Sequence, residues 1–438
     1  MKKTYFIADI VKKIGEKVEL MGWVYTKRDH KKIVFLDLRD KSGIVQVVGD
    51  DKFASLTPES AVKIIGTVVE RPPHMVNSKI PTGSIEVQAD EFEVLSPAPT
   101  LPFEINVEKL DLTLPTLLDW RPLTMRNLAQ TDIFRVQSAI ATGFRNAALA
   151  LGCLEIFTPT IAGGSSEGGT EVFPIKYYEH DAFLVQSPQL YKQMLIPVFE
   201  RVSMISKAYR AEPSVTTRHL SESTQMDCEL GFFEFAQLLD ALEKVGTETI
   251  RFAYDQNMHI FAKANIHPPL IPKSVPRLTL KEALDLIFEK TGRDVRNEPD
   301  LDPEGERFLC QWSAETHESD FVTVTHFPMS KRPFYTLPDP NNPQLSLSYD
   351  LLFRGVEVLS GAQRQHDFQL LKNAIKEKGM DTSNFGLYLQ AFEFGMPPHG
   401  GFSFGLERLT MKLLELENVR EASLFPRDME RIDTRLSQ

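Results

Sequence analysis

The stretch YRAEPSVTTRHLSESTQMDCELGFF, residues 209–233, decides the fold of the larger part of this chain. Arg210 and Glu212 end one strand-like run, and Arg218 follows a turn that leads into a second run. Arginine presents a planar fork of donors that matches phosphate, and a carboxylate accepts a hydrogen bond from an amine such as that of adenine. The charges therefore favour a nucleotide site on a hairpin, although an ordinary surface hairpin also carries charges.

A glycine-rich segment, GGSSEGGTEVF at residues 163–173, precedes this hairpin and contains Glu167. Glycine adopts backbone angles that other residues avoid, so such a loop can move and close over a ligand. A plain surface loop has the same composition, and the segment alone leaves both interpretations open.

Two charged segments follow the hairpin. In RGVEVLSGAQRQHD, residues 354–367, Glu357 and Ser360 offer oxygen ligands that suit Mg²⁺, and Arg364 offers a cation. In GMPPHGGFSFGLERL, residues 395–409, glycines lead into a helix that carries Arg408, and a helix that begins after glycines favours an anion at its start. Each segment is ambiguous by itself, but their order and spacing are specific.

Length and composition indicate a globular protein of two or three domains, because the chain has 438 residues of which 42% are hydrophobic. The formal net charge of -11 argues against polyanion binding over the whole surface. Residues 1–32, however, contain nine Lys/Arg and four Asp/Glu, a local charge of +5. This charge indicates either a basic binding face or a solvated surface.

Cysteine use and hydropathy favour a cytoplasmic protein. Cys153, Cys228 and Cys310 are odd in number and far apart, so they indicate neither a disulfide framework nor a zinc site. No apolar run of about 18 residues and no signal-peptide pattern occurs, and we expect neither secretion nor membrane insertion.

The chain changes its pattern twice. Short strands with alternating polarity fill residues 17–95, the size of an OB-fold barrel, and a proline-rich linker follows. A helical face with apolar residues three and four apart begins at Ile133 and ends near Leu151. We therefore predict three parts: an OB-fold domain at 1–97, a linker at 98–129 and a larger mixed α and β domain at 130–438. No P-loop, dinucleotide fingerprint or HExxH pattern occurs, so ATP, if used, is bound by another route.

The ordered segments resemble the class II aminoacyl-tRNA synthetases, and specifically the aspartyl-tRNA synthetases of the short archaeal and eukaryotic type. LGCLEIFTPTI, which contains Pro159, is similar to their motif 1, which builds the dimer interface. YRAE and TRHLSE resemble motif 2, and GGFSFGLERL resembles motif 3. The resemblance implies an α+β fold, in which an OB-fold that binds the anticodon precedes an antiparallel sheet flanked by helices, and it implies a homodimer.

The resemblance also implies two reaction steps: activation of L-aspartate by ATP to aspartyl-adenylate, and transfer of the aspartyl group to the 3′ end of tRNA. Arg210 would hold the α-phosphate and a substrate carboxylate oxygen, and Glu212 the adenine amine. Arg408 would stack on adenine and touch the γ-phosphate, with Gly405 allowing close approach. Ser223 stands where relatives often have a phenylalanine that stacks on adenine. The further residues implied at the ATP site are Arg218, His219 and Leu220, with Mg²⁺ on Glu357 and Ser360.

The resemblance places the aspartate pocket around LVQSPQLYKQ, residues 184–193. Lys192 and Arg364 would hold the side-chain carboxylate, and two cations reject the neutral amide of asparagine because buried charges would stay unpaired. The other residues implied here are Glu167, Gln189 and Asp227 at the substrate ammonium, and Arg210 and Ser360 beside it. Without the resemblance, Lys192 would be read as a solvated helix lysine.

In the small domain the resemblance implies that Phe35 stacks on the anticodon and Gln46 hydrogen-bonds it, with Arg28 as another contact. Without it, Phe35 would more often belong to the core. His30 and Pro81 resemble the residues of non-discriminating enzymes, which charge tRNA-Asn as well as tRNA-Asp with aspartate. The alternative is a discriminating enzyme that charges tRNA-Asp alone.

Three other functions remain open. An asparaginyl-tRNA synthetase is disfavoured by Lys192, and a tRNA-independent amino-acid ligase by the OB-like region. An inactive tRNA-binding paralogue is disfavoured by the joint presence of Arg210, Glu357 and Arg408.

Overall fold

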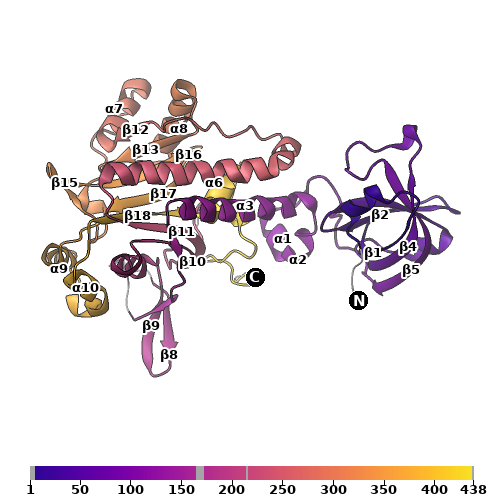
Figure 1. Ribbon diagram of the computed structural model, residues 1–438, viewed down its shortest axis with the longest axis horizontal. Coiled ribbons are helices and arrows are strands. Elements are labelled where there is room, and N and C mark those ends of the chain that lie inside the picture. The colour runs from indigo at the N-terminus through magenta and orange to yellow at the C-terminus, as the bar shows by residue number, and fades with distance from the viewer. Residues whose placement is uncertain (1–4, 164–171, 214–215, 437–438) are drawn as a thin grey trace. The chain divides into compact units, whose positions relative to one another are not determined.

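The computed structural model describes residues 5–163, 172–213 and 216–436. The chain divides into two compact units, shown in Figure 1. The first unit contains residues 1–111 and 126–128, and the second contains residues 112–125 and 129–438. The segment at 98–129 is therefore shared between the units, and each unit is described by itself below.

The first unit is a closed five-stranded barrel with strand order β1-β2-β3-β5-β4, which confirms the predicted OB-fold. In β2 the side chains of Val34, Leu36 and Leu38 are fully buried, and Phe35 and Asp37 alternate with them on the outer face. Phe35 therefore lies outside the core, where an unpaired base could reach it. The strands are β1 (Lys17–Asp29), β2 (Val34–Asp40), β3 (Gly43–Gly49), β4 (Ala61–Glu70) and β5 (Ile85–Ser96), with short helices η1 (Ile7–Lys12), η2 (Asp51–Ser55) and η3 (Pro73–Met75).

The second unit is built on an eight-stranded sheet with order β12-β13-β16-β17-β18-β11-β10-β6. The central strands are antiparallel, and the pairs β12–β13 and β10–β6 near the edges are parallel. This arrangement confirms the predicted α+β class. The strands are β6 (Leu154–Glu155), β10 (Arg201–Tyr209), β11 (Glu222–Gly231), β12 (Arg277–Thr279), β13 (Phe321–Thr325), β16 (Ser348–Phe353), β17 (Val356–Gln363) and β18 (His399–Gly405).

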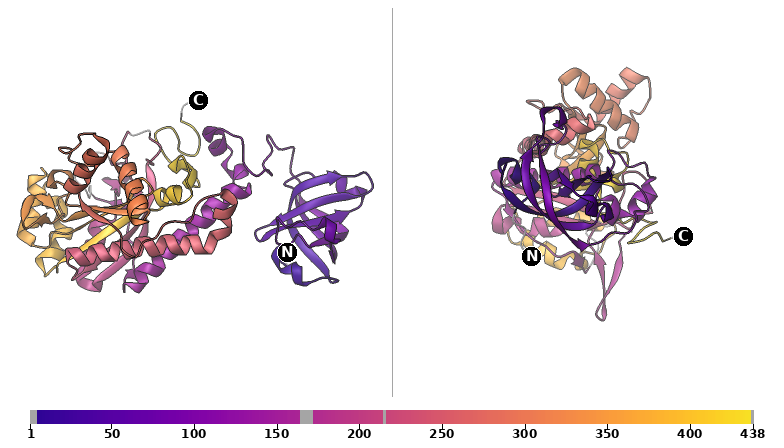
Figure 2. Two further views of the ribbon diagram at one scale, coloured as in Figure 1. Left: turned by 90° about the horizontal axis from the view of Figure 1, so that it is seen from above. Right: turned by 90° about the vertical axis from the view of Figure 1, so that its right-hand side faces the viewer.

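Two long helices, α3 (Leu128–Ala150) and α6 (Phe235–Ala264), run side by side (Figures 1 and 2). They approach closely because Gly143 has no side chain, and a Cβ there would lie 2.9 Å from the carbonyl oxygen of Thr249. The predicted apolar face of α3 packs into the main core through Ile133, Val136, Ile140 and Phe144.

One face of the sheet packs against α6, and on the opposite face Met204 and Val324, near the two ends of the sheet, pack against shorter helices. Gly246 of α6 lies against Leu351 and Phe404, so these two side chains point to the helices. Successive side chains of a strand point to opposite faces, so their neighbours Asp350 and Ser403 point to the face away from α6. Strand register places Asp350 opposite Ser360, Ser360 opposite Ser403, and Ser403 opposite Asp227. A polar row therefore crosses four central strands.

Shorter elements surround this sheet. The helices are α1 (Leu114–Asp119), α2 (Arg121–Thr124), α4 (Gln189–Met194), α5 (Ile196–Phe199), α7 (Leu280–Thr291), α8 (Pro303–His317), α9 (Phe368–Glu377), α10 (Gly386–Glu393), α11 (Leu406–Leu413), η4 (Met329–Lys331), η5 (Thr382–Phe385) and η6 (Val419–Ala422). The remaining strands are β7 (Ile161–Ala162), β8 (Pro174–Tyr177), β9 (His180–Leu184), β14 (Pro338–Asp339) and β15 (Asn342–Ser346). Among the described helices, none combines the length and apolarity needed to cross a membrane.

Candidate active site

Lys192 on α4 reaches the polar row from the side. Its side chain is only 1% exposed, and Nζ lies 2.8 Å from Asp227 Oδ1 and 3.3 Å from Glu229 Oε2. A lysine loses its hydration at such a site, so it needs paired anions. The interpretation of Lys192 as a solvated helix lysine is therefore wrong.

Arg364, which directly follows β17, joins the same group of charges. Its Nε donates to Glu229 Oε1 at 2.9 Å, and its Nη2 donates to the carbonyl of Gly401 at 3.0 Å and to Gln189 Oε1 at 3.2 Å. Glu229 thus contacts both cations that the sequence assigned to the substrate carboxylate. Within the described residues, Asp227 Oδ2 and Gln189 Nε2 are buried without a hydrogen-bond partner.

Gly401 on β18 makes room for this cluster. A Cβ at position 401 would overlap the Glu229 carboxylate and the carbonyl oxygen of Cys228. The absence of a side chain at position 401 therefore leaves room for the Glu229 carboxylate. Gly405 differs, because a Cβ there would meet only Arg408 Cβ at an ordinary 3.5 Å.

The charges of the cluster shift each other's pKa values. Burial raises the pKa of Asp227, and Lys192 opposes that rise. Burial would raise the pKa of Glu229 too, but Arg364 and Lys192 together hold it below its usual range. We infer that Glu229 is ionised and pairs with Lys192 and Arg364 before any substrate arrives.

A chain of hydrogen bonds between uncharged side chains supports α4. His399 Nε2 lies 2.9 Å from the Gln193 amide nitrogen, and His399 Nδ1 lies 2.9 Å from the carbonyl of Pro397. Tyr388 donates to Gln193 Oε1 at 3.0 Å. Burial lowers the pKa of His399 to about 4, so its Nδ1 donates, its Nε2 accepts, and the ring stays neutral at pH 7.

The predicted ATP residues converge at the end of the hairpin β10–β11. Arg210 and Glu212 follow β10, and the backbone N–H of Arg210 donates to the carbonyl of Ser221 at 2.9 Å. Burial lowers the pKa of His219, and Arg408 of motif 3 lowers it further. Arg210 and Arg218 act on His219 in the same direction. Motifs 2 and 3 therefore lie close enough for their charges to interact.

Other predicted residues of this region have structural contacts. Leu220 packs against the small core cluster that contains Met411. The carboxylate of Glu407 accepts from the backbone N–H of Thr224 at 2.9 Å and so ties α11 to β11. Arg408 lies at the start of the same helix, and its Nη1 donates to the carbonyl of Glu357 at 2.9 Å.

Asp350 lies in the polar row although the sequence interpretation missed it. It faces Ser360 on the next strand, and Arg332 Nη2 donates to its Oδ2 at 2.8 Å. Burial and the charge of Asp350 raise the pKa of Glu357 to about 7. An acidic residue inside the apolar run SYDLLF was the available signal.

These carboxylates test the fit of Mg²⁺. Asp350 Oδ1 is buried without a hydrogen-bond partner in the described part of the chain, and repulsion by Asp350 adds to the effect of burial in raising the pKa of Glu357. A divalent cation relieves such repulsion, and oxygen ligands are the ones that Mg²⁺ prefers. Asp350, Glu357 and Ser360 therefore fit the ion. Glu167, predicted at the substrate ammonium, lies outside the described residues.

The barrel has a polar pocket of about 370 Å³ on its outer face. Arg28 Nη2 donates to Gln46 Oε1 at 3.1 Å, and Gln46 Nε2 donates to Glu86 Oε2 at 2.8 Å. The rings of His30 and Phe35 meet edge to face with centroids 5.6 Å apart. The structure thus brings together the three predicted anticodon residues and His30, which was predicted to affect tRNA discrimination, and they line this pocket with Asp37, Arg71, Met75 and Asn77. Pro81 is exposed in the loop before β5.

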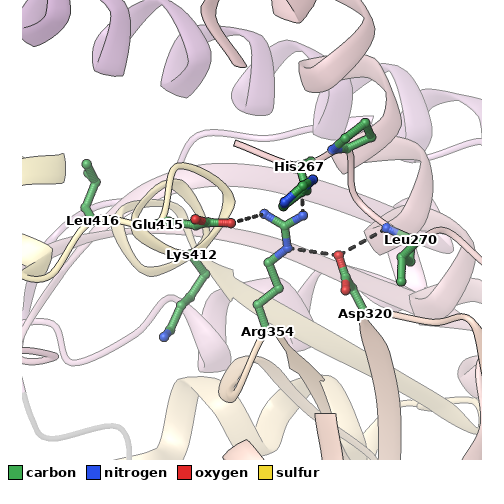
Figure 3. A pocket seen from close by; sticks show the side chains of 8 residues that line it. His267, Leu270, Asp320, Arg354, Lys412, Glu415 and Leu416 are labelled. Carbon is green, nitrogen blue, oxygen red and sulfur yellow. Dashed lines mark hydrogen bonds and ion pairs between the residues drawn. The ribbon is translucent and has the colours of Figure 1, made fainter. Parts of the chain in front are cut away.

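A larger cavity of about 790 Å³ lies elsewhere on the second unit, around Arg354 (Figure 3). Arg354 is fully engaged by the protein itself: Nε donates to Asp320 Oδ2 at 2.9 Å, Nη2 to the carbonyl of His267 at 2.9 Å, and Nη1 to Glu415 Oε1 at 3.4 Å. These contacts hold the turn between β16 and β17 in place, so the cavity is not the candidate active site.

Comparisons with known proteins agree with this geometry. The family described as tRNA synthetases class II (D, K and N) matches residues 113–429, and the OB-fold nucleic acid binding domain matches residues 18–95. An aspartate–tRNA(Asp/Asn) ligase of Thermus thermophilus is 43% identical over 97% of this chain and 99% of that protein. An aspartate–tRNA(Asp) ligase of Pyrococcus horikoshii is 37% identical over 99% of this chain and 100% of that protein.

A solved structure extends the likeness to the whole fold. The asparaginyl-tRNA synthetase of Pyrococcus horikoshii, complexed with asparaginyl-adenylate, matches with a TM-score of 0.90 and 30% identity over 99% of this chain and 100% of that chain. The relatives, the matched families and the two-unit fold agree along nearly the full length. The chain therefore belongs to the class II tRNA synthetases, and within them to the aspartyl-tRNA synthetases.

Proposed function

We propose that this protein activates L-aspartate with ATP to aspartyl-adenylate and transfers the aspartyl group to the 3′ end of tRNA-Asp and also of tRNA-Asn. The observation that carries the choice of amino acid is the convergence of Lys192 and Arg364 on Glu229 beside Asp227. Asp227 would take the substrate ammonium, so the two cations and Glu229 leave one positive charge, which favours a carboxylate side chain over a neutral amide.

The aspartate would lie over the polar row. Asp227 Oδ2, which has no partner among the described residues, supplies an acceptor for the ammonium group. Gln189 Oε1 is already engaged by Arg364, so its predicted role at the ammonium requires that contact to loosen. Gln189 Nε2 is free for an oxygen of the substrate.

The first step needs positioning more than proton transfer. One oxygen of the substrate α-carboxylate attacks the α-phosphorus in line with the departing pyrophosphate. A carboxylate is already ionised at pH 7, so no strong base is needed, and the enzyme contributes by alignment and charge neutralisation. We assign the α-phosphate to Arg210, the adenine amine to Glu212, the outer phosphates to Arg218 and His219, and the adenine face to Arg408.

Mg²⁺ would be held by Glu357, Ser360 and Asp350. When bound, the ion neutralises phosphate charge and orients the phosphate chain. Arg332 already neutralises one oxygen of Asp350, which leaves its Oδ1 for the cation.

The barrel would bind the anticodon through the pocket of Arg28, Phe35 and Gln46, because a half-exposed aromatic ring next to hydrogen-bonding groups suits an unpaired base. His30 lies at the edge of that ring, which supports a role in discriminating between anticodons. Relatives from Thermus thermophilus, Deinococcus radiodurans and Aeropyrum pernix carry the Asp/Asn name, and this supports the charging of both tRNAs.

We also propose a homodimer that forms through motif 1. Leu154 and Phe157 of this segment are 50% and 86% exposed in the single chain. Large apolar side chains exposed this far favour a covering partner. Sedimentation of the purified protein tests the association.

The test of function is charging of purified tRNA-Asp and tRNA-Asn with labelled aspartate, side by side. Charging of both supports the whole proposal, and charging of tRNA-Asp alone identifies a discriminating enzyme. Charging of neither, with no aspartate-dependent pyrophosphate exchange, identifies an inactive tRNA-binding paralogue. A preference for labelled asparagine would contradict the role of Lys192.

A further inference from the structure

Helix α8 lies outside the three motifs but directs one acidic residue toward the ATP region. Asp302 caps the helix by accepting from the backbone N–H of Gly305 at 2.8 Å. Leu309 and Cys310 of α8 are buried in a core cluster with Leu352 of the central sheet. Glu306 precedes them by three and four residues, so it lies on the same face of the helix.

Glu306 makes an ion pair with motif 2. Its Oε2 lies 2.7 Å from Nη1 of Arg218, and the two side chains are 12% and 26% exposed. In the described part of the chain, Nε and Nη2 of Arg218 make no hydrogen bond. A guanidinium has five donors, so this single contact fixes the group while leaving donors for a phosphate.

The surroundings of Glu306 carry charges of both signs. Burial raises the pKa of Glu306, Arg218 and Arg408 lower it, and the carboxylate of Asp350 raises it. Lys412, one turn after Arg408 on α11, interacts electrostatically with Glu306 as well, and Figure 3 shows its side chain pointing away from Arg354. Three cations, Arg218, Arg408 and Lys412, therefore lie near Glu306 together with the carboxylates of Asp350 and Glu357, which are assigned to Mg²⁺.

We propose that Glu306 is a positioning residue for ATP, which holds the guanidinium of Arg218 in the place where the outer phosphates bind. The inference rests on the proposed role of Arg218 in ATP binding. A free arginine side chain loses rotamer freedom when a ligand orders it, and an arginine that the protein has already ordered loses less. Glu306 thus contributes to the affinity for ATP through Arg218, without touching the reacting atoms.

The test compares Glu306→Gln with Glu304→Gln in aspartate-dependent pyrophosphate exchange. Glu304 lies in the first turn of the same helix, but its side chain is 66% exposed and pairs with Arg293 at 3.0 Å. Both variants remove one negative charge from the same helix end, so the control accounts for net charge and helix stability. We expect Glu306→Gln to raise the KM for ATP about tenfold, as loss of one charge-assisted contact does. The KM for aspartate and the kcat stay within about twofold of the parent, and Glu304→Gln matches the parent throughout.

A double mutant separates positioning from a general effect on the fold. If Glu306 acts through Arg218, Glu306→Gln causes no further rise in the KM for ATP once Arg218 is alanine. Additive effects, an unchanged KM for ATP in Glu306→Gln, or a lower KM would each overturn the inference. If the parent shows no pyrophosphate exchange, the proposed function fails. Calorimetric titration of the parent, Glu306→Gln and Glu304→Gln with Mg-ATP alone then tests the role of Glu306.

Discussion

Lys192 carries a positive charge in a place where an unpaired ammonium would be strongly unfavourable. Two carboxylates, Asp227 and Glu229, neutralise it. A buried ion pair is weak support for stability in itself, since apolar residues of equal volume often do as well. A binding role explains better why charged residues occupy this site.

We expect Lys192→Gln to lower kcat/KM for aspartate by at least about a hundredfold, because the substrate carboxylate loses a charge partner that neutral groups do not replace. Pyrophosphate exchange over a range of aspartate concentrations measures the change. The matched control is Lys207→Gln, since the Lys207 side chain is 47% exposed and pairs with Glu222 at 3.3 Å. A Lys192→Gln enzyme with nearly normal use of aspartate would contradict the pocket assignment.

His399 makes the stability of the second unit depend on pH. Its pKa is about 4 in the folded chain and about 6.5 in an unfolded one. Between these values the unfolded state binds more protons, so stability is complete above about pH 6.5 and falls as the pH drops toward 4, by up to about 3 kcal/mol.

Urea unfolding at pH 7 and pH 4.5 tests this dependence. We expect His399→Asn to show a smaller difference between the two pH values than the parent, because the group that must be protonated is gone. His180→Asn, at an exposed position on β9, should keep the difference of the parent. Equal differences in all three proteins would show that other groups govern the acid sensitivity.

At the scale of elements, β18 is the strand on which the site depends most. It separates the strand that carries Asp227 and Glu229 from the strand that carries Glu357 and Ser360. Its glycine at position 401 admits the Glu229 carboxylate, and its end leads into α11 with Arg408. A single strand therefore connects the residues assigned to aspartate with those assigned to ATP.

We expect Gly401→Ala to destabilise the protein by about 1–3 kcal/mol, as overpacking does, and to reduce activity, because Glu229 must move away from Lys192 and Arg364. Gly386→Ala is the control: Gly386 has helical angles, and a Cβ there would meet nothing within 4 Å. That change should be neutral or stabilising by about 0.4–1 kcal/mol. Denaturant unfolding and pyrophosphate exchange measure both variants, and a fully active, stable Gly401→Ala protein would contradict the packing argument.

At the scale of the whole molecule, the residues assigned to the reaction and those assigned to the anticodon lie in different units. The second unit holds every described residue assigned to aspartate and ATP, and the first holds the pocket around Arg28. The basic segment at residues 1–32 contributes Arg28 to this pocket.

We therefore expect Arg28→Ala to raise the KM for tRNA about tenfold while leaving aspartate-dependent pyrophosphate exchange unchanged, since a lost nucleic-acid contact costs about 1–3 kcal/mol. Lys17→Ala provides the control, because Lys17 lies on the same strand but pairs with Asp90 outside the pocket. Initial rates of tRNA charging and of exchange, measured on the same preparations, separate the two effects. Loss of exchange in Arg28→Ala would contradict the separation of roles.

The amino-acid sequence by itself determined the local structure and the chemistry of the short segments. Alternating polarity was enough to predict the barrel strands, and the spacing of apolar residues by three and four was enough to predict α3, because these patterns depend on backbone geometry within one element. The charged residues of motifs 2 and 3 were also visible, since each motif is contiguous in the chain.

Only the tertiary structure decided which of these residues meet. Glu229 pairs with Arg364 from 135 residues away, and Arg218 pairs with Glu306 from 88 residues away. Asp350 joins the polar row only through strand register, and a shift by one residue would turn it to the helix side. Local patterns fix the period of an element but not its neighbours, which depend on long-range packing and on the pairing of buried charges.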